Sequence, residues 1–209
     1  MPNKRTYLML TLIRSGETSW DESARLRGRS NLPLSEPGRA AVQHDLARPL
    51  GLAFKTVYHP PDDAATQTAH LAAAVCSART RESQDLSEPD LGLLEGLTRR
   101  QFAERHPKRC KQWDDDPLAL VPPEGEPLAE ARARLLAEVA RLVRRARAPE
   151  LAIVLHPLAL GMLRCWLADR PARELNRLLK DRPRIERYVI TLATVRQMHE
   201  TAMAMVAGT

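Results

Sequence analysis

Two short, uncharged runs of mostly apolar residues constrain the fold of this chain more than any other feature. Residues 7–13 read YLMLTLI and residues 151–155 read LAIVL. Runs of this length and composition are typical of strands that are buried on both faces, as the strands of a parallel sheet are. The two runs therefore predict central strands of a sheet that helices cover on both sides.

Helical patterns alternate with these strands. Ser35 stands where a helix N-cap is expected, and the acids that follow the prolines 60–61 suit the first turn of a helix. Helices are expected at residues 37–48, 62–74, 98–104, 128–146 and 158–168, with further strands at 53–58 and, as a strand or hairpin, 187–196. Residues 113–127 are rich in Pro, Asp and Gly and predict a loop. The alternation predicts a three-layer α/β/α sandwich with a mostly parallel central sheet.

Composition places the chain among ordinary globular proteins. It has 209 residues, of which 44% are hydrophobic and 28% are charged, and it shows no internal repeat or linker, so we expect one domain over residues 1–209. The apolar run near the N-terminus is too short for a signal peptide, and no stretch is long enough for a membrane span. The cysteines 76, 110 and 165 form no metal-ligand pattern. We therefore expect a cytoplasmic protein without a metal or other cofactor.

The charge balance is basic, with 32 Lys and Arg against 26 Asp and Glu, and only five of the bases are Lys. Arginine suits the recognition of phosphate and carboxylate, so a polyanionic partner has to be considered. The bases are scattered and interleaved with acids, however, which is typical of solvated helix faces. An Arg-rich and Ala-rich composition is also what GC-rich codons encode. Binding to nucleic acid is therefore only a minor alternative.

Polar residues follow three of the predicted strands. Arg14 and Ser15 come after the first, Tyr58 and His59 close the second, and His156 comes directly after LAIVL. In a parallel sheet the carboxyl ends of the strands meet at one edge, and ligands bind there. The sequence therefore predicts a functional site at this edge.

Five motifs span nearly the whole chain. They are LIRSGETSWDESARLRGRSNLPLSEPGR at residues 12–39, VYHPPDDAATQTA at 57–69, LSEPDLGLLEGLT at 86–98, PPEGEPLAEARARL at 122–135 and IVLHPLALGMLR at 153–164. Their order and spacing resemble those of the histidine phosphatase superfamily, the phosphoglycerate mutase-like proteins. The resemblance implies the phosphoglycerate mutase-like fold and phosphoryl transfer through a phosphohistidine.

That chemistry needs a neutral imidazole nucleophile, cations around the phosphoryl oxygens and an acid that protonates the leaving oxygen. By resemblance, Arg14 is a cation of the phosphate site, Glu88 is the proton donor and His156 is the second histidine of the pocket. Arg27 and His59 are weaker candidates for phosphate binding, since His59 could offer a pH-dependent cation.

Four positions depart from the family pattern. Ser15 stands where the nucleophilic histidine is expected, and an alcohol is a far weaker nucleophile than imidazole without an activating base. Ala64 takes the place of the second arginine, which removes a charge-assisted hydrogen bond. Asp21 replaces an asparagine near the pocket, and Pro157 replaces a glycine and has no backbone N–H for an anion. Together these changes predict a pocket that no longer transfers phosphoryl groups.

The function expected from the sequence is that of an inactive pseudo-phosphatase, a binding or scaffold protein for an unknown protein or small anionic ligand. Ser15, Glu88 and His156 would then be a vestigial catalytic set, with weak anion binding by Arg14 and His156. The rival interpretations are a weakly active phosphatase or phosphomutase for a phosphorylated metabolite and a hydrolase that uses Ser15 with His156 and Glu88.

Three points stay open at this stage. Arg14 and Glu88 could form a salt bridge that neutralises the pocket instead of holding an anion. Trp113 and the acids after it could form a lid or a partner surface, although a solvated loop is the default expectation. A homodimer is compatible with the sequence, which does not determine the oligomeric state.

Overall fold

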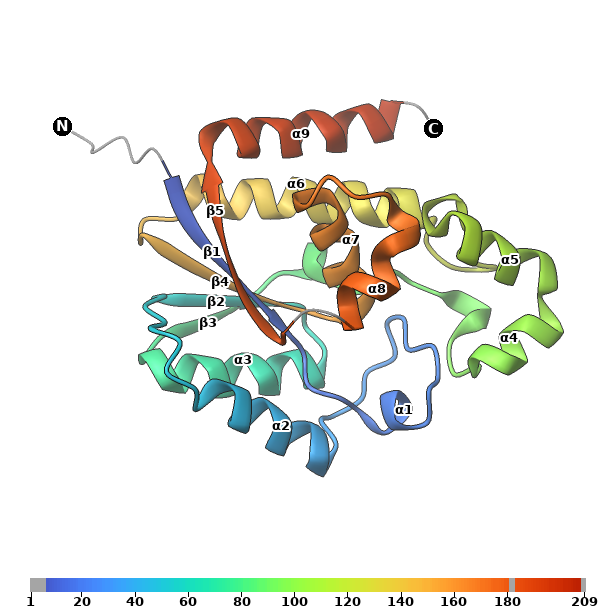
Figure 1. Ribbon diagram of the computed structural model, residues 1–209, viewed down its shortest axis with the longest axis horizontal. Helices are drawn as coiled ribbons and strands as arrows, with labels where there is room; N and C mark the ends of the chain where they lie inside the picture. Colours follow the sequence, from blue (N-terminus) through green and yellow to red (C-terminus); the bar gives the residue numbers. More distant parts are fainter. Residues whose placement is uncertain (1–6, 181–182, 208–209) are drawn as a thin grey trace.

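A sheet of five strands organises the part of the chain that the structure describes, residues 7–180 and 183–207 of this computed structural model (Figure 1). The strands lie in the order β3-β2-β4-β1-β5. Their bounds are β1 Tyr7–Arg14, β2 Thr56–His59, β3 Arg79–Glu82, β4 Glu150–Leu155 and β5 Ile185–Thr191. The first four are parallel, and β5 runs antiparallel to β1 at one edge. The predicted α/β sandwich with a mostly parallel sheet is confirmed.

The two apolar runs form the centre of the sheet, as the sequence predicts. β1 and β4 pair in register, with Leu10 opposite Leu151 and Leu12 opposite Ile153. All six residues of β4 are buried. Because helices cover both faces of these strands, side chains on either face lose their contact with water, which explains why their sequences do not alternate with polar residues.

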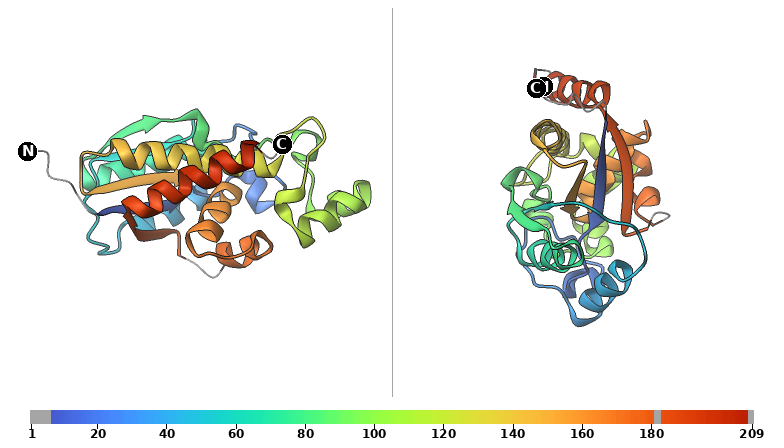
Figure 2. Two further views of the ribbon diagram at one scale, coloured as in Figure 1. Left: turned by 90° about the horizontal axis from the view of Figure 1, so that it is seen from above. Right: turned by 90° about the vertical axis from the view of Figure 1, so that its left-hand side faces the viewer.

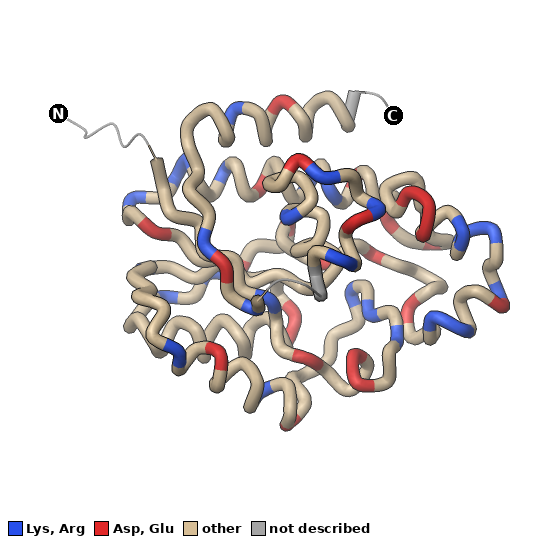
Figure 3. Tube along the Cα trace, viewed as in Figure 1, with Lys and Arg blue, Asp and Glu red and all other residues tan. Residues whose placement is uncertain are grey.

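Helices cover both faces of the sheet (Figure 2). One layer contains α2 (Glu36–Leu46) and α3 (Asp63–Cys76), which pack on the cluster around Val57 and Val154. The other layer contains α6 (Leu128–Arg145), α7 (Pro157–Leu167) and α9 (Leu192–Ala207). The remaining helices are α1 Ser19–Glu22, α4 Arg99–Arg105, α5 Pro107–Asp115 and α8 Leu175–Lys180, with 3-10 turns at Gln84–Leu86, Gly92–Leu94, Pro117–Ala119 and Ala172–Glu174. Charged residues gather on helices and loops, while the central strands carry few (Figure 3).

The expected loop at residues 113–127 was wrong in its first part. Trp113 belongs to α5, is 7% exposed and packs edge-on against Phe102 with ring centroids 6.1 Å apart. It anchors a helix to the core and is not part of a solvated loop. The sequence of α5, PKRCKQWDD, is mostly polar, and only Cys110 and Trp113 are buried. Two apolar positions are too few to indicate a helix by their spacing. Residues 187–196 also differ from a hairpin, because β5 ends at Thr191 and α9 begins at Leu192.

The start of α2 fixes the loop that follows β1. The backbone N–H of Ser35 donates to the carbonyl oxygen of Glu17 at 2.9 Å, and the Ser35 hydroxyl accepts from the N–H of Gly38 as an N-cap. The two segments approach so closely that a Cβ atom on Gly38 would lie 2.2 Å from the Glu17 carbonyl oxygen. A glycine at this position therefore lets the helix hold the loop in place.

Replacing Gly38 tests this close approach. In an exposed helix, Gly→Ala stabilises by up to about 1 kcal/mol, but here the added methyl group collides with backbone. We expect Gly38→Ala to destabilise the protein by roughly 1–3 kcal/mol, the usual cost of overpacking, in urea unfolding followed by circular dichroism. A neutral or stabilising effect would show that the loop is not held by this contact.

No helix among the described residues combines the length and the apolar composition needed to cross a membrane.

Candidate active site

The carboxyl ends of β1 and β4 and the first residues of α3 and α7 form one site at an edge of the sheet. Ser15 follows β1, and its N–H donates to the carbonyl oxygen of Leu155 at 2.9 Å. His156 is the N-cap residue of α7, and Asp62 is the N-cap residue of α3, where its Oδ1 accepts from the N–H of Ala65. Parallel strands thus bring together three segments that are far apart in sequence.

His156 and Asp62 form a direct hydrogen-bonded pair. The imidazole Nε2 lies 2.7 and 2.8 Å from the two carboxylate oxygens of Asp62, and His156 is 1% exposed. Burial raises the pKa of Asp62, but the hydrogen bond to His156 and the charges of His156 and Arg27 outweigh it and lower the pKa below its usual value. The Asp62 carboxylate is therefore ionised and can only accept a hydrogen bond. The proton in this bond accordingly lies on His156 Nε2.

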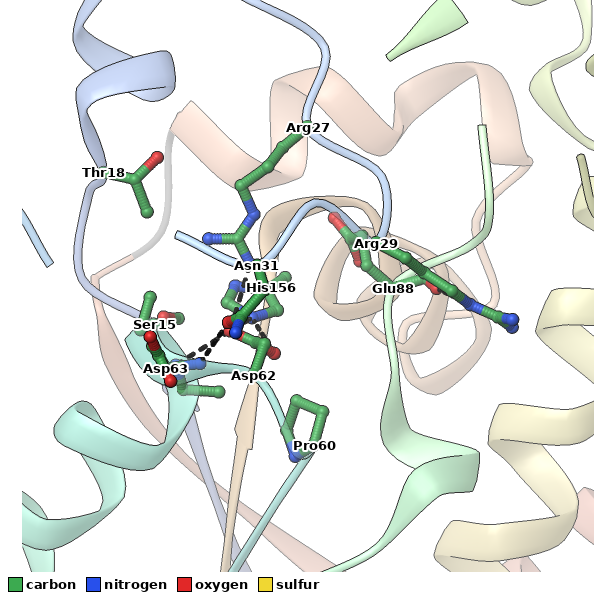
Figure 4. Close-up of polar contacts among 12 residues, drawn as sticks. Ser15, Thr18, Arg27, Arg29, Asn31, Pro60, Asp62, Asp63, Glu88 and His156 are labelled. Carbon is green, nitrogen blue, oxygen red and sulfur yellow. Dashed lines mark hydrogen bonds and ion pairs between the residues drawn. The ribbon is translucent and has the colours of Figure 1, made fainter. Parts of the chain in front are cut away.

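Arg27 completes this group. Its Nη2 lies 3.6 Å from Asp62 Oδ1, and its side chain is 6% exposed. Figure 4 shows Arg27, Asp62 and His156 directed toward one another, with Glu88 beside Arg29. Arg27, Asp62 and Glu88 line a cavity of about 70 Å³. Sites for small-molecule ligands usually measure about 300–1,000 Å³, so this cavity is small for a substrate.

Glu88 binds the N-terminus of α7. Its two carboxylate oxygens accept hydrogen bonds from the N–H groups of Leu158 and Ala159, both at 2.7 Å. Burial raises the pKa of Glu88, although His156, the two N–H groups and Arg27 act in the opposite direction. The sequence left a salt bridge between Arg14 and Glu88 open; in the described part of the chain, the Glu88 carboxylate instead accepts from these two N–H groups at the helix N-terminus. Pro157 lacks an N–H, but the next two residues supply the donors.

Arg14 lies in a second charged network. Its Nη2 is 3.5 Å from Glu17 Oε1, while Arg184 donates to both oxygens of Glu17 at 3.0 and 2.9 Å. Arg184 also donates to Asp45 Oδ2 and to the carbonyl oxygen of Ser15, both at 2.9 Å. Burial and the nearby Arg184 lower the pKa of Arg14, and Glu17 opposes this shift. Arg184 therefore fixes the backbone on which Arg14 and Ser15 lie.

The remaining residues predicted from the sequence have other contacts. The Ser15 hydroxyl is buried and donates to the Gly16 carbonyl oxygen at 3.3 Å. Asp21 accepts from the N–H and hydroxyl of Thr18, so its charge serves the N-cap of α1. His59 Nδ1 lies 2.8 Å from the Pro60 carbonyl oxygen and 3.4 Å from the Thr66 hydroxyl. Ala64 is fully buried.

Sequence reasoning missed Asp62 and Arg184 as members of the site. Asp62 was recognisable as the start of a helix after two prolines, but nothing in the sequence indicated that it faces His156. Arg184 lies beyond the last motif, 167 residues after Glu17, and only the antiparallel pairing of β5 with β1 brings it close. Among the described residues, no group of three or more His, Cys, Asp or Glu side chains is arranged to hold a metal ion.

Comparison with known proteins assigns the family. Residues 10–193 match the Histidine phosphatase superfamily (branch 1). The chain belongs to this superfamily. It is 31% identical over 202 residues to the bifunctional protein Rv2228c of Mycobacterium tuberculosis, and the match covers 94% of this chain and 55% of that protein. The chain thus spans about half the length of this curated relative.

Two further members agree with the assignment. A protein named probable phosphoglycerate mutase GpmB from Salmonella arizonae is 26% identical over 171 residues, which cover 82% of this chain and 80% of that protein. The solved structure of Bacillus stearothermophilus YhfR superimposes with a TM-score of 0.74 at 26% identity, covering 80% of this chain and 83% of that one. The histidine phosphatase fold predicted from the motifs is confirmed.

The pair of Asp62 and His156 predicts a pH-dependent stability. Because the folded-state pKa of Asp62 is lowered, its contribution is present above the ordinary aspartate pKa and is lost as the pH falls through the folded-state value. Asn retains the N-cap but not the charge, so we expect Asp62→Asn to lose about 1–3 kcal/mol of unfolding free energy at pH 7. The loss should shrink below about pH 4.

Asp63→Asn is the matched control, because Asp63 is exposed in the same first turn of α3. Urea unfolding at pH 7 and pH 3 would measure both variants. An unfolding free energy of Asp62→Asn that equals that of the control at pH 7, or a deficit that does not change with pH, would contradict the role assigned to the carboxylate.

Proposed function

We propose that this histidine phosphatase superfamily member is a catalytically silent pseudo-phosphatase that acts by binding a protein or a small anionic molecule. One observation carries the proposal: the His156 imidazole and the first N–H groups of α7, which would bind a phosphoryl group, are already hydrogen-bonded to the chain's own carboxylates. Asp62 accepts from His156 and pairs with Arg27, and Glu88 occupies the N-terminus of α7.

The residue at the nucleophile position also supports a catalytically silent protein. Ser15 stands where the family motif has histidine, and its hydroxyl donates to Gly16 rather than to a base. His156, the obvious base in the pocket, directs Nε2 at Asp62. A serine without an activating base is a poor nucleophile near pH 7, and this arrangement also gives no support to a Ser15-based hydrolase.

The pocket also has one cation fewer than the family motif provides. The position of the second phosphate-binding arginine is Ala64, whose side chain is fully buried and surrounded by protein. Each charge-assisted hydrogen bond of this kind is worth about 1.5–3 kcal/mol, so its loss weakens phosphate binding by roughly 10-fold or more. Two carboxylates at the same site add to the cost of bringing in a phosphate dianion.

The experiment compares phosphatase turnover of the wild type with that of Ser15→His. Ser15→His restores the nucleophile. It restores neither the missing arginine nor free N–H groups at the start of α7. We expect both proteins to turn over p-nitrophenyl phosphate and a panel of phosphorylated metabolites below about 10⁻³ s⁻¹, against 1–10³ s⁻¹ for typical enzymes. An active histidine phosphatase assayed beside them controls for substrate quality.

A double variant, Ser15→His combined with Asp62→Ser, frees His156 while serine keeps the N-cap of α3. It should also remain silent, because Ala64 still leaves the phosphoryl oxygens one cation short. Turnover by the wild type at the level of the active control would contradict the proposal. If Ser15→His alone restored turnover, it would show that a substrate easily displaces Asp62 from His156 and Glu88 from the N-terminus of α7.

A further inference from the structure

A second concave surface lies away from the candidate active site, between the last turns of α6 and the open face of β2 and β3. It has a volume of about 860 Å³ and shares no lining residue with the cavity around Arg27 and Glu88. Thr56 and the half-buried Tyr58 of β2 line it, together with Arg141 and Arg145 of α6. We call it the basic groove.

Five cationic side chains line the basic groove: Lys55, Arg81, Arg141, Arg145 and Arg147. Within the described part of the chain, only Arg141 of these five forms an ion pair, with Glu138. Two carboxylates also line the groove, but that of Glu150 is buried and already accepts hydrogen bonds from Thr11 and Ala53. Glu82 alone is exposed, so the groove presents a clear excess of positive charge.

The sequence did not reveal this excess because the bases come from three separate segments. Along α6 they alternate with acids and indicate a solvated helix face, while Lys55 and Arg81 are isolated in sequence. The parallel pairing of β2 with β3 and β4 brings these segments to the end of α6. Basic residues are visible at this end of the molecule in Figure 3.

We propose that the basic groove binds single-stranded nucleic acid, with the cations on the phosphodiester backbone and a base stacked on Tyr58. Positively charged grooves that carry an aromatic side chain are the common solution for single strands, because every base has a face that stacks. Arginine, which supplies four of the five cations, matches phosphate oxygens with two parallel N–H groups.

The shape and lining of the groove favour this ligand over other polyanions. A membrane surface cannot enter a concavity between a helix and a sheet, so anionic lipid would reach only the rim. An acidic peptide would satisfy the cations but would make no use of the aromatic ring of Tyr58 in the lining. Because the groove lies apart from Ser15 and His156, nucleic acid binding is independent of whether the phosphatase chemistry is silent.

Fluorescence anisotropy with labelled dT12 and rU12 tests the proposal. At about 150 mM salt we expect the wild type to bind with a Kd of roughly 10⁻⁴–10⁻⁶ M, the range typical of non-specific binding. The logarithm of the affinity should fall with the logarithm of salt concentration with a slope of about −3, since each phosphate contact on a single strand contributes about −0.7. The absence of binding at low salt would overturn the proposal.

A charge-reversed variant locates the binding. Arg145→Glu with Arg147→Glu changes two exposed cations of the groove, and we expect at least roughly 10-fold weaker binding and a slope reduced by about 1.4. Arg100→Glu with Arg105→Glu makes the same charge change on α4, outside the groove, and should alter affinity by less than about twofold. Equal losses in both variants would show attraction to the net charge alone and would overturn the assignment to the groove.

Tyr58→Leu tests the stacking contact while keeping an apolar side chain in the core cluster that Tyr58 contacts. We expect it to weaken dT12 binding at least about fivefold with an unchanged salt slope. Competition with polyglutamate and with anionic vesicles tests whether the groove prefers an acidic peptide or a lipid surface to the oligonucleotide. Displacement of the oligonucleotide by polyglutamate at equal charge concentration, or by vesicles, would replace the proposed ligand with an acidic peptide or a lipid surface.

Discussion

The carboxylate of Asp62 is the group on which the carboxyl-terminal edge of the sheet depends. It caps α3, accepts the Nε2–H of His156 at the start of α7 and lies beside Arg27 from the loop before α2. Three segments that approach the site from different directions thus share one anion. Without it, the buried Arg27 guanidinium would lose its ion-pair partner and the Nε2–H of His156 would lose its acceptor, which is far more costly than losing an exposed ion pair.

Glu88 plays a comparable part for α7. A helix N-terminus attracts an anion because its first N–H groups lack partners and its dipole is positive there. In this chain the carboxyl group of Glu88 takes that place, accepting hydrogen bonds from the N–H groups of Leu158 and Ala159. The N-terminus of α7 is therefore already occupied by a side chain, and an incoming ligand would have to replace these two hydrogen bonds.

Sequence reasoning succeeded where a local pattern has a single physical cause. The uncharged runs 7–13 and 151–155 could only be interior strands, and Ser35 could be recognised as an N-cap because hydroxyl side chains satisfy exposed N–H groups. It failed where tertiary packing decides. The polar helix α5 is held by the burial of Trp113, and Arg184 and the basic groove exist only because strand pairing brings distant segments together. The motifs located Ser15, Glu88 and His156, but not what these residues contact.

The contact between Arg184 and Glu17 limits the order in which the site can form. Glu17 is separated from Arg184 by 167 residues, and the guanidinium reaches it from the segment just before β5. During synthesis, Arg184 leaves the ribosome 167 residues after Glu17. A nascent chain that already contains β1 to β4 still lacks Arg184, so the loop of Ser15 and Glu17 cannot be fixed in this way until the segment before β5 has been made.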